Sequence, residues 1–176
     1  MSSQQRFSGV AFLILGTLIG SCRNHNFSGD GHWTDHGVWS WRPRYEIDME
    51  PEVRLDGRTD EYIFRFTGMP RDAMDLTFRV NPIVSSSDVR ANSAVLRVDL
   101  RDVGGPSLCS FQSEISELKV MEQQERAIKL WSPLCLDLKF DPAKKYELTV
   151  RIVGRSDGSK LLGLVPQLSG GGWDSL

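Results

Sequence analysis

All three histidines of the 176-residue chain lie within twelve positions, at His25, His32 and His36, and Asp30 and Asp35 stand among them. Imidazole and carboxylate groups are ligand types that zinc and copper accept. His32 and His36 would share one face of a helix, but the glycines that flank this pair disfavour a helix there. No further ligand pattern supports a site. We therefore favour a polar tether in which the histidines meet by chance, and we expect no metal and no cofactor.

Sequence signatures of common enzyme classes are absent from the chain. It has no His-Glu-x-x-His motif, no Walker loop and no Cys-x-x-Cys pair. Its single Gly-x-Ser-x-Gly spacing, at residues 154–158, falls at a predicted hairpin turn and lacks the strand-to-helix context of a nucleophile elbow. Aspartate and glutamate together number 23, yet spacing alone does not place two carboxylates about 5–9 Å apart across a cleft. The sequence thus names no catalytic residue and favours a protein that is not an enzyme.

Four aromatic residues stand in and just after the histidine-rich segment, at Trp33, Trp39, Trp41 and Tyr45. Exposed rings of this kind can stack on sugars or lie at a membrane interface. Trp39, Trp41 and Tyr45 share the odd-numbered parity of the apolar residues that follow them, and residues of one parity face one side of a strand. We therefore expect these three to pack in a core.

The elements that would position these residues begin with an apolar leader. Residues 1–9 are polar and carry one charged side chain, Arg6, and the apolar run Val10–Ile19 follows them. Ten helical residues rise about 15 Å, half of a roughly 30 Å hydrocarbon core, so the run is too short to span a bilayer. The small residues Gly20 and Ser21 come next, as in a secretory signal.

The segment Leu18-Ile19-Gly20-Ser21-Cys22 resembles the lipobox of bacterial lipoproteins. The resemblance covers residues 1–22 only, and the single arginine of the first nine residues departs from the family's basic start. It implies that residues 1–21 are removed and that Cys22 becomes the first residue, acylated on its thiol. The alternatives are an ordinary signal peptide with a chance cysteine and an uncleaved anchor.

Lipidation would decide where the protein resides. Two or three acyl chains hold a protein in a membrane essentially permanently, since each buried methylene contributes about 0.8 kcal/mol. The resemblance places the protein in the bacterial cell envelope, on the periplasmic or extracellular face. Arg23 follows the lipidated position, where the family's sorting rule has aspartate for the inner membrane, and it favours the outer membrane in a Gram-negative organism.

The remaining cysteines are Cys109 and Cys135, an even pair in an oxidising compartment. We expect a disulfide, which would close a loop of 27 residues counting both cysteines. The alternative is two free buried thiols, which behave as small hydrophobic residues.

The net charge of the chain argues against a nucleic-acid partner. The chain has 21 basic and 23 acidic side chains, which give a net charge of −2, whereas proteins that bind nucleic acid through charge are basic.

The body of the chain reads as strands. Period-two alternation of apolar residues recurs in eight or nine short segments separated by turn residues. Residues 113–126 fit either a short helix or a strand with a polar loop, and Asp157-Gly158 is a hairpin signal. The alternating segments are 39–55, 62–66, 76–80, 94–100, 109–111, 128–130, 134–140, 146–152 and 162–168.

This pattern predicts an all-β fold, a two-sheet antiparallel sandwich. Residues 140–150, from Phe140-Asp141-Pro142 to Tyr146 and its alternating strand, resemble the tyrosine corner of fibronectin type III and other immunoglobulin-like domains. That resemblance implies an immunoglobulin-like sandwich, with a jelly roll as the alternative. The expected organisation is a signal peptide (1–21), a lipidated cysteine with a polar tether (22–37), the sandwich (38–168) and a flexible tail (169–176).

The function expected from these features is that of a membrane-anchored envelope lipoprotein. Its sandwich would be a non-enzymatic binding domain for an envelope protein or a glycan, and the lipid would be its contact with the membrane. One alternative is an envelope hydrolase or glycan-processing enzyme that uses loop carboxylates. Another is an immunity or inhibitor lipoprotein directed against a secreted toxin.

Overall fold

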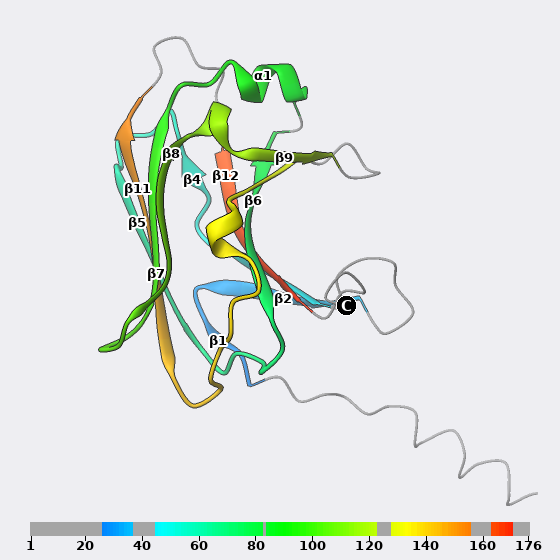
Figure 1. Ribbon diagram of the computed structural model, residues 1–176, viewed down its shortest axis with the longest axis vertical. Helices are drawn as coiled ribbons and strands as arrows, with labels where there is room; N and C mark the ends of the chain where they lie inside the picture. Colours follow the sequence, from blue (N-terminus) through cyan, green and yellow to red (C-terminus); the bar gives the residue numbers. More distant parts are fainter. Residues whose placement is uncertain (1–25, 37–44, 83, 123–127, 156–162, 171–176) are drawn as a thin grey trace, which may run out of the picture.

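The computed structural model describes residues 26–36, 45–82, 84–122, 128–155 and 163–170. In these ranges the chain forms two antiparallel sheets packed face to face (Figure 1). Sheet A has the spatial order β1 (Ser28–Gly29), β5 (Glu61–Thr67), β11 (Lys145–Gly154), β7 (Val95–Asp102), β8 (Ser107–Glu114). Sheet B has the order β2 (Gly31–Asp35), β3 (Tyr45–Met49), β12 (Gly163–Gly170), β6 (Met74–Asn81), β10 (Ile128–Trp131), β9 (Lys119–Glu122), with β4 (Val53–Arg54) also paired to β12. The helical segments are α1 (Ser86–Arg90), η1 (Ile115–Glu117) and η2 (Pro133–Cys135).

Strand alternation produces the core between the sheets. In β3 the odd-numbered side chains from Tyr45 to Met49 are buried, and the two even-numbered side chains between them point away from the core. In β11 the even-numbered side chains from Tyr146 to Ile152 are buried in the same way. Burying apolar surface contributes about 25 cal/mol per Å², so this parity fixes which face of each strand turns inward.

The strand order is that of a jelly roll. If the eight principal strands (β3, β5, β6, β7, β8, β10, β11 and β12) are numbered along the chain, sheet B reads 1-8-3-6 and sheet A reads 2-7-4-5. Two interlocked Greek keys give this order. The expected two-sheet antiparallel sandwich is confirmed. Of the two orders considered, the structure has the jelly roll and not the immunoglobulin-like one.

The tyrosine corner is nevertheless present as a local contact. The hydroxyl of Tyr146 accepts a hydrogen bond from the backbone N–H of Asp141 at 2.6 Å and donates to the carbonyl oxygen of the same residue at 3.2 Å. The ring packs edge-on against Phe140, with centroids 4.9 Å apart. This contact fixes how the chain enters β11. It does not determine which strands β11 pairs with, so it was no guide to the strand order.

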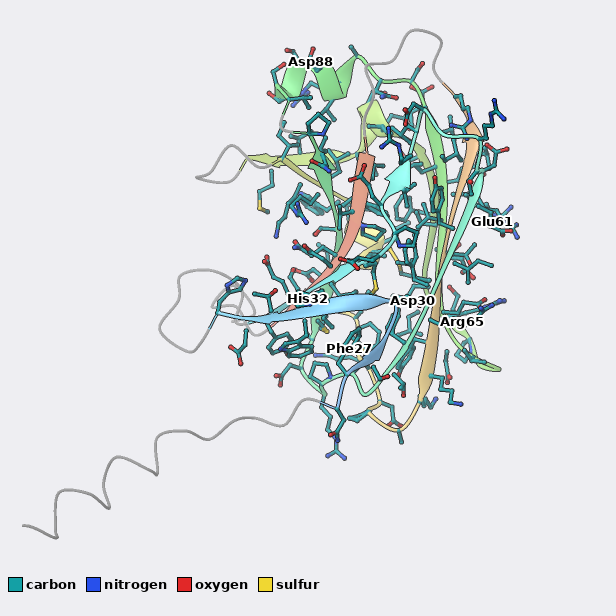
Figure 2. All side chains as sticks on the ribbon, turned by 180° about the vertical axis from the view of Figure 1, so that it is seen from behind. Phe27, Asp30, His32, Glu61, Arg65 and Asp88 are labelled. Atoms are coloured by element: carbon teal, nitrogen blue, oxygen red, sulfur yellow. A yellow bond between two sulfur atoms is a disulfide. The ribbon has the colours of Figure 1, made fainter. Side chains whose placement is uncertain are left out.

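The folded domain begins before residue 38, the start expected from the sequence. β1 pairs with β5 and β2 pairs with β3, so residues expected in a tether belong to both sheets. Asp30 lies where β1 meets β2, beside β5 (Figure 2); its N–H donates to the carbonyl oxygen of Arg65 at 2.9 Å, and its carboxylate accepts from the N–H of Arg65 at 2.8 Å. Gly29 has φ +140°, and a Cβ there would lie 2.2 Å from that carbonyl oxygen. Only glycine permits so close an approach.

Two further boundaries differ from the expectation. The ambiguous stretch 113–126 contains the end of β8, the short helix η1 and the strand β9, so both alternatives hold for part of it; residues 123–127 lie outside the described residues. Residues 169 and 170, expected in the flexible tail, belong to β12, and residues 171–176 lie outside the described residues. Among the helices of the described ranges, none has the length and apolar character needed to cross a membrane.

Candidate functional site

The outer face of sheet B carries polar side chains that are unusually buried. Gln167 on β12, Lys129 on β10 and Thr77 on β6 point away from the core, yet they are only 2%, 4% and 8% exposed. An outward strand position on an antiparallel sheet is ordinarily solvated. Burying a polar group is unfavourable unless it is hydrogen-bonded. We call this set the polar face: His36, Glu46, Asp48, Thr77, Arg79, Lys129, Trp131 and Gln167.

Asp48 is the centre of the first group of contacts on the polar face. Its Oδ2 accepts a hydrogen bond from the guanidinium of Arg79 at 2.6 Å, and its Oδ1 accepts from the amide Nε2 of Gln167, also at 2.6 Å. The strand register explains the meeting, because Gln167 is directly opposite Asp48. Both oxygens of the carboxylate are thereby engaged, and the amide of Gln167 is oriented.

Glu46 is the centre of the second group. It accepts from Nζ of Lys129 at 2.7 Å and contacts Nε2 of His36 at 3.0 Å. Burial acts to raise the pKa of the Glu46 carboxyl, but the hydrogen bond and charge of Lys129, and then those of His36, outweigh burial and hold the pKa below its ordinary value. A carboxylate with a lowered pKa stays ionised, which is the opposite of what a general acid needs.

Two hydrogen-bonding atoms are left over at the middle of the polar face. Within the described residues, Oε1 of Gln167 and Oγ1 of Thr77 have no partner. These two residues are directly opposite each other, and Thr77 is also opposite Trp131. A buried polar atom without a partner costs about 1–3 kcal/mol. The row Asp48, Gln167, Thr77, Trp131 therefore contains two buried hydrogen-bonding atoms without a partner next to a half-buried indole ring, and a ligand reaches them only when the side chains that cover them move aside.

The two described histidines have separate roles. His32 is exposed on β2, opposite Asp48, whereas His36 contacts Glu46. The chain is extended here, so four residues separate the two imidazoles by about 13 Å along it, too far for one metal ion. The described residues contain no group of three or more potential metal ligands. His25 lies outside these ranges, and the shared helix face considered for the other two does not exist.

Other residues singled out in the sequence have structural positions. Cys109 and Cys135 form the expected disulfide, which joins β8 to η2. Tyr45 packs in the core as expected, 4% exposed, and stacks on Trp33 with ring centroids 4.8 Å apart. The predicted lipidation site Cys22 and the two tryptophans at 39 and 41 lie outside the described residues.

The sequence analysis singled out only His36 among the eight residues of the polar face. The seven that it missed are Glu46, Asp48, Thr77, Arg79, Lys129, Trp131 and Gln167. Each stands at an outward position of an alternating strand, where a polar residue is unremarkable. Their significance appears only when strand pairing places them in neighbouring columns. Lys129, which stands between Ile128 and Leu130, was the one available signal, since a lysine between two core residues has to find a partner when it is buried.

No family model matches the chain, and no curated protein matches it either. Among solved structures, the carbohydrate-binding module TmCBM27, described for specific mannan recognition, aligns at 12% identity with a TM-score of 0.40, over 83% of this chain and 90% of that one. The module CBM27-1 of Caldicellulosiruptor saccharolyticus, solved with mannohexaose, aligns at 8% identity with a TM-score of 0.39, over 82% and 97%. At these values neither similarity identifies a ligand, which has to be argued from the residues of this chain.

Proposed function

We propose that the protein is a non-catalytic envelope lipoprotein, anchored by lipid on Cys22, whose sandwich binds a glycan through the polar face. The observation that carries the glycan proposal is the pair of unpartnered atoms on Gln167 and Thr77 beside the ring of Trp131. Sugars present hydroxyl groups around the ring and C–H groups on its faces. A carboxylate, an amide, a hydroxyl and an indole in one row complement both kinds of group.

The charges on the polar face favour a neutral sugar. Arg79 is paired with Asp48, and Lys129 is paired with Glu46. Each positive charge is thus balanced by a carboxylate within hydrogen-bond distance, and no excess remains for a charged ligand. The ionised state of Glu46 supports binding over hydrolysis, because a glycoside hydrolase needs one carboxyl group that holds its proton.

Thr77→Val gives a sharp test because it removes only the unpartnered hydroxyl. An isosteric change of this kind leaves stability unchanged or raises it, so the variant stays folded. Full-length protein in neutral detergent is titrated with soluble mannan, β-glucan, galactan and xylan, followed by tryptophan fluorescence and calorimetry. We expect at least one polymer to bind the native protein, and Thr77→Val to weaken that binding roughly tenfold, which corresponds to about 1.4 kcal/mol.

The matched control is Thr149→Val, an outward threonine at the middle of sheet A. It should bind the same polymer as tightly as the native protein. Two further variants extend the test. Gln167→Ala should lose glycan binding, whereas Trp131→Phe, which keeps an aromatic ring, should largely retain it. If none of the four polymers binds, or if both threonine variants bind like the native protein, the polar face is not a glycan site.

A further inference from the structure

The outer face of sheet A, on the opposite side of the molecule from the polar face, contains an open hollow of about 220 Å³. It lies over the strands β7, β8 and β11, whose inward side chains form the core. Outward side chains of β5, including Glu61 and Arg65, lie on the same face (Figure 2). The residues that line the hollow are Arg97, Asp99, Arg101, Ser110, Thr149 and Arg151.

Two arginines stand side by side on adjacent strands in the lining of this hollow. Arg97 on β7 is directly opposite Arg151 on β11. Like charges at directly opposed positions of neighbouring strands destabilise a sheet. Arg97 has no ion pair among the residues that the structure describes. An anion bound next to both guanidinium groups would offset the repulsion between their positive charges.

The neighbouring arginines retain donors as well. Arg151 donates from Nε to Glu61 at 2.5 Å, and Arg101 donates from one terminal nitrogen to Glu147 at 2.5 Å. A guanidinium has five N–H donors in a fixed fork. Each of these arginines therefore holds its carboxylate through one nitrogen and can still bind a second acceptor. The hydroxyl groups of Ser110 and Thr149 line the same hollow.

The net charge on the outer face of sheet A indicates what charge a ligand of the hollow would carry. Three neighbouring rows of the sheet, given by the strand register, contain four arginines and three carboxylates, an excess of one positive charge. Asp99 is the carboxylate inside the hollow, and it accepts a hydrogen bond from Ser107 at 2.8 Å. A ligand with one negative charge balances this surface, whereas a dianion would be repelled by Asp99. The rows are Arg65, Glu147, Arg101; Thr149, Asp99, Ser110; and Glu61, Arg151, Arg97.

We propose that this hollow binds a phosphodiester group. A phosphodiester carries one negative charge and two free oxygens, and guanidinium forks match such oxygens in pairs. Bound between Arg97 and Arg151, it would screen their mutual repulsion. Phosphodiesters occur in an envelope as lipid headgroups and as phosphate-linked polymers. This site is separate from the polar face, so its ligand and the glycan would bind independently.

The test uses full-length protein in neutral detergent, with dimethyl phosphate as the probe and NMR of backbone amides and arginine Nε–H groups as the readout. We expect saturable shifts confined to Arg97, Thr149, Arg151 and their neighbours. Arg97→Gln changes an exposed side chain and should weaken binding roughly tenfold, as loss of a charge-assisted hydrogen bond does. Arg65→Gln, on the same face but outside the hollow, should stay within about twofold of the native affinity.

A second arm identifies the source of the phosphodiester. Glycerophosphoglycerol represents a lipid headgroup, and poly(glycerol phosphate) represents a polymer. Binding of either probe that is lost in Arg97→Gln supports the site, and the tighter probe assigns the source. The proposal is overturned if dimethyl phosphate shifts no residue of the hollow, or if Arg97→Gln and Arg65→Gln weaken binding equally. Arg97→Gln should bind glycan as the native protein does, so that a failure of the phosphodiester proposal can be distinguished from a failure of the glycan proposal.

Discussion

Glu46 and Asp48 occupy equivalent outward positions two residues apart on β3, yet their surroundings differ. About a third of the Asp48 and Arg79 side chains is exposed, whereas Lys129 beside Glu46 is 5% exposed. Exposed ion pairs contribute about 0–1 kcal/mol, but a buried charge that loses its partner costs about 3 kcal/mol. The Glu46–Lys129 pair therefore fixes the polar face, while the pair around Asp48 is free to rearrange on a ligand.

The lowered pKa of Glu46 makes stability depend on acidity. A carboxyl group whose pKa is lowered by folding contributes all of its stabilisation above its ordinary value of 4.5 and loses it as the pH falls through the lower, folded-state value. Glu46→Gln removes this contribution. Its free energy of unfolding, measured by urea titration from neutral pH to about pH 3, should fall less steeply below the ordinary pKa than that of the native protein. Equal slopes would contradict this assignment.

The contribution of the Tyr146 hydroxyl to stability can be tested by removing that single oxygen atom. Its buried hydroxyl both accepts from and donates to the backbone of Asp141, so Tyr146→Phe should lower the free energy of unfolding by about 1.5 kcal/mol. Tyr62→Phe is the control, because its hydroxyl accepts from the N–H of Arg54 at 3.0 Å and donates to the carbonyl oxygen of Arg54 at 3.5 Å, but at an exposed position. Its loss should cost under about 0.5 kcal/mol. Chemical denaturation measures both, and equal losses would remove the special role of the corner.

At the scale of elements, the disulfide is the covalent link between β8 of sheet A and η2, which follows β10 of sheet B. The two cysteines are 26 positions apart, and closing such a loop in the unfolded chain is worth about 3.5 kcal/mol in the chain-entropy model. The double variant Cys109→Ala, Cys135→Ala should lose about this much stability. Urea unfolding with and without reductant checks it: reductant should lower the native stability and leave that of the double variant unchanged.

Strand alternation predicted the buried side chains where a strand forms, because burial depends on the local parity of each strand. The odd positions of β3 and the even positions of β11 were foreseen for this reason. Alternation was wrong for 134–140, where η2 takes the place of the expected strand and Leu134 is 65% exposed. Pairing depends on contacts between distant segments and was not foreseen. Asp157-Gly158 suggested a hairpin, yet the strands on either side, β11 and β12, belong to opposite sheets. The short strands β1 and β2 were missed because two glycines, Gly29 and Gly31, mask their alternation.

The polar face could not be predicted from the sequence either, because it depends on which distant strands pair. Apart from His36, which follows β2, its residues come from β3, β6, β10 and β12, and these strands become neighbours only in sheet B. Asp48 and Gln167, for example, are 119 positions apart in the sequence. Taken one strand at a time, Thr77 or Gln167 is an ordinary outward polar residue. The burial of these side chains and their unpartnered atoms follow from the packing of four strands, which no single window of sequence contains.

At the scale of the whole molecule, the early start of the domain shortens the link to the proposed lipid. Phe27 already packs against Phe66 and Trp33, with ring centroids 6.4 and 6.1 Å apart. Five residue steps separate Phe27 from Cys22, and a fully extended chain spans at most about 18 Å in that distance. A tether that ran to residue 37 would reach three times as far. Lipidation would therefore hold the sandwich close to the leaflet.

Cys22→Ala tests the anchor on which the envelope placement depends. Loss of the thiol removes the acceptor of the acyl groups, so the variant should incorporate no labelled palmitate, whereas the native protein should be labelled and recovered with the membranes. The double variant at Cys109 and Cys135 is the control and should be labelled like the native protein, because its changes lie in the folded domain. Mass spectrometry of the native protein should find Cys22 as an acylated first residue. Retention of Met1, or an unmodified Cys22, would contradict the lipoprotein assignment and leave both binding faces to be explained in another compartment.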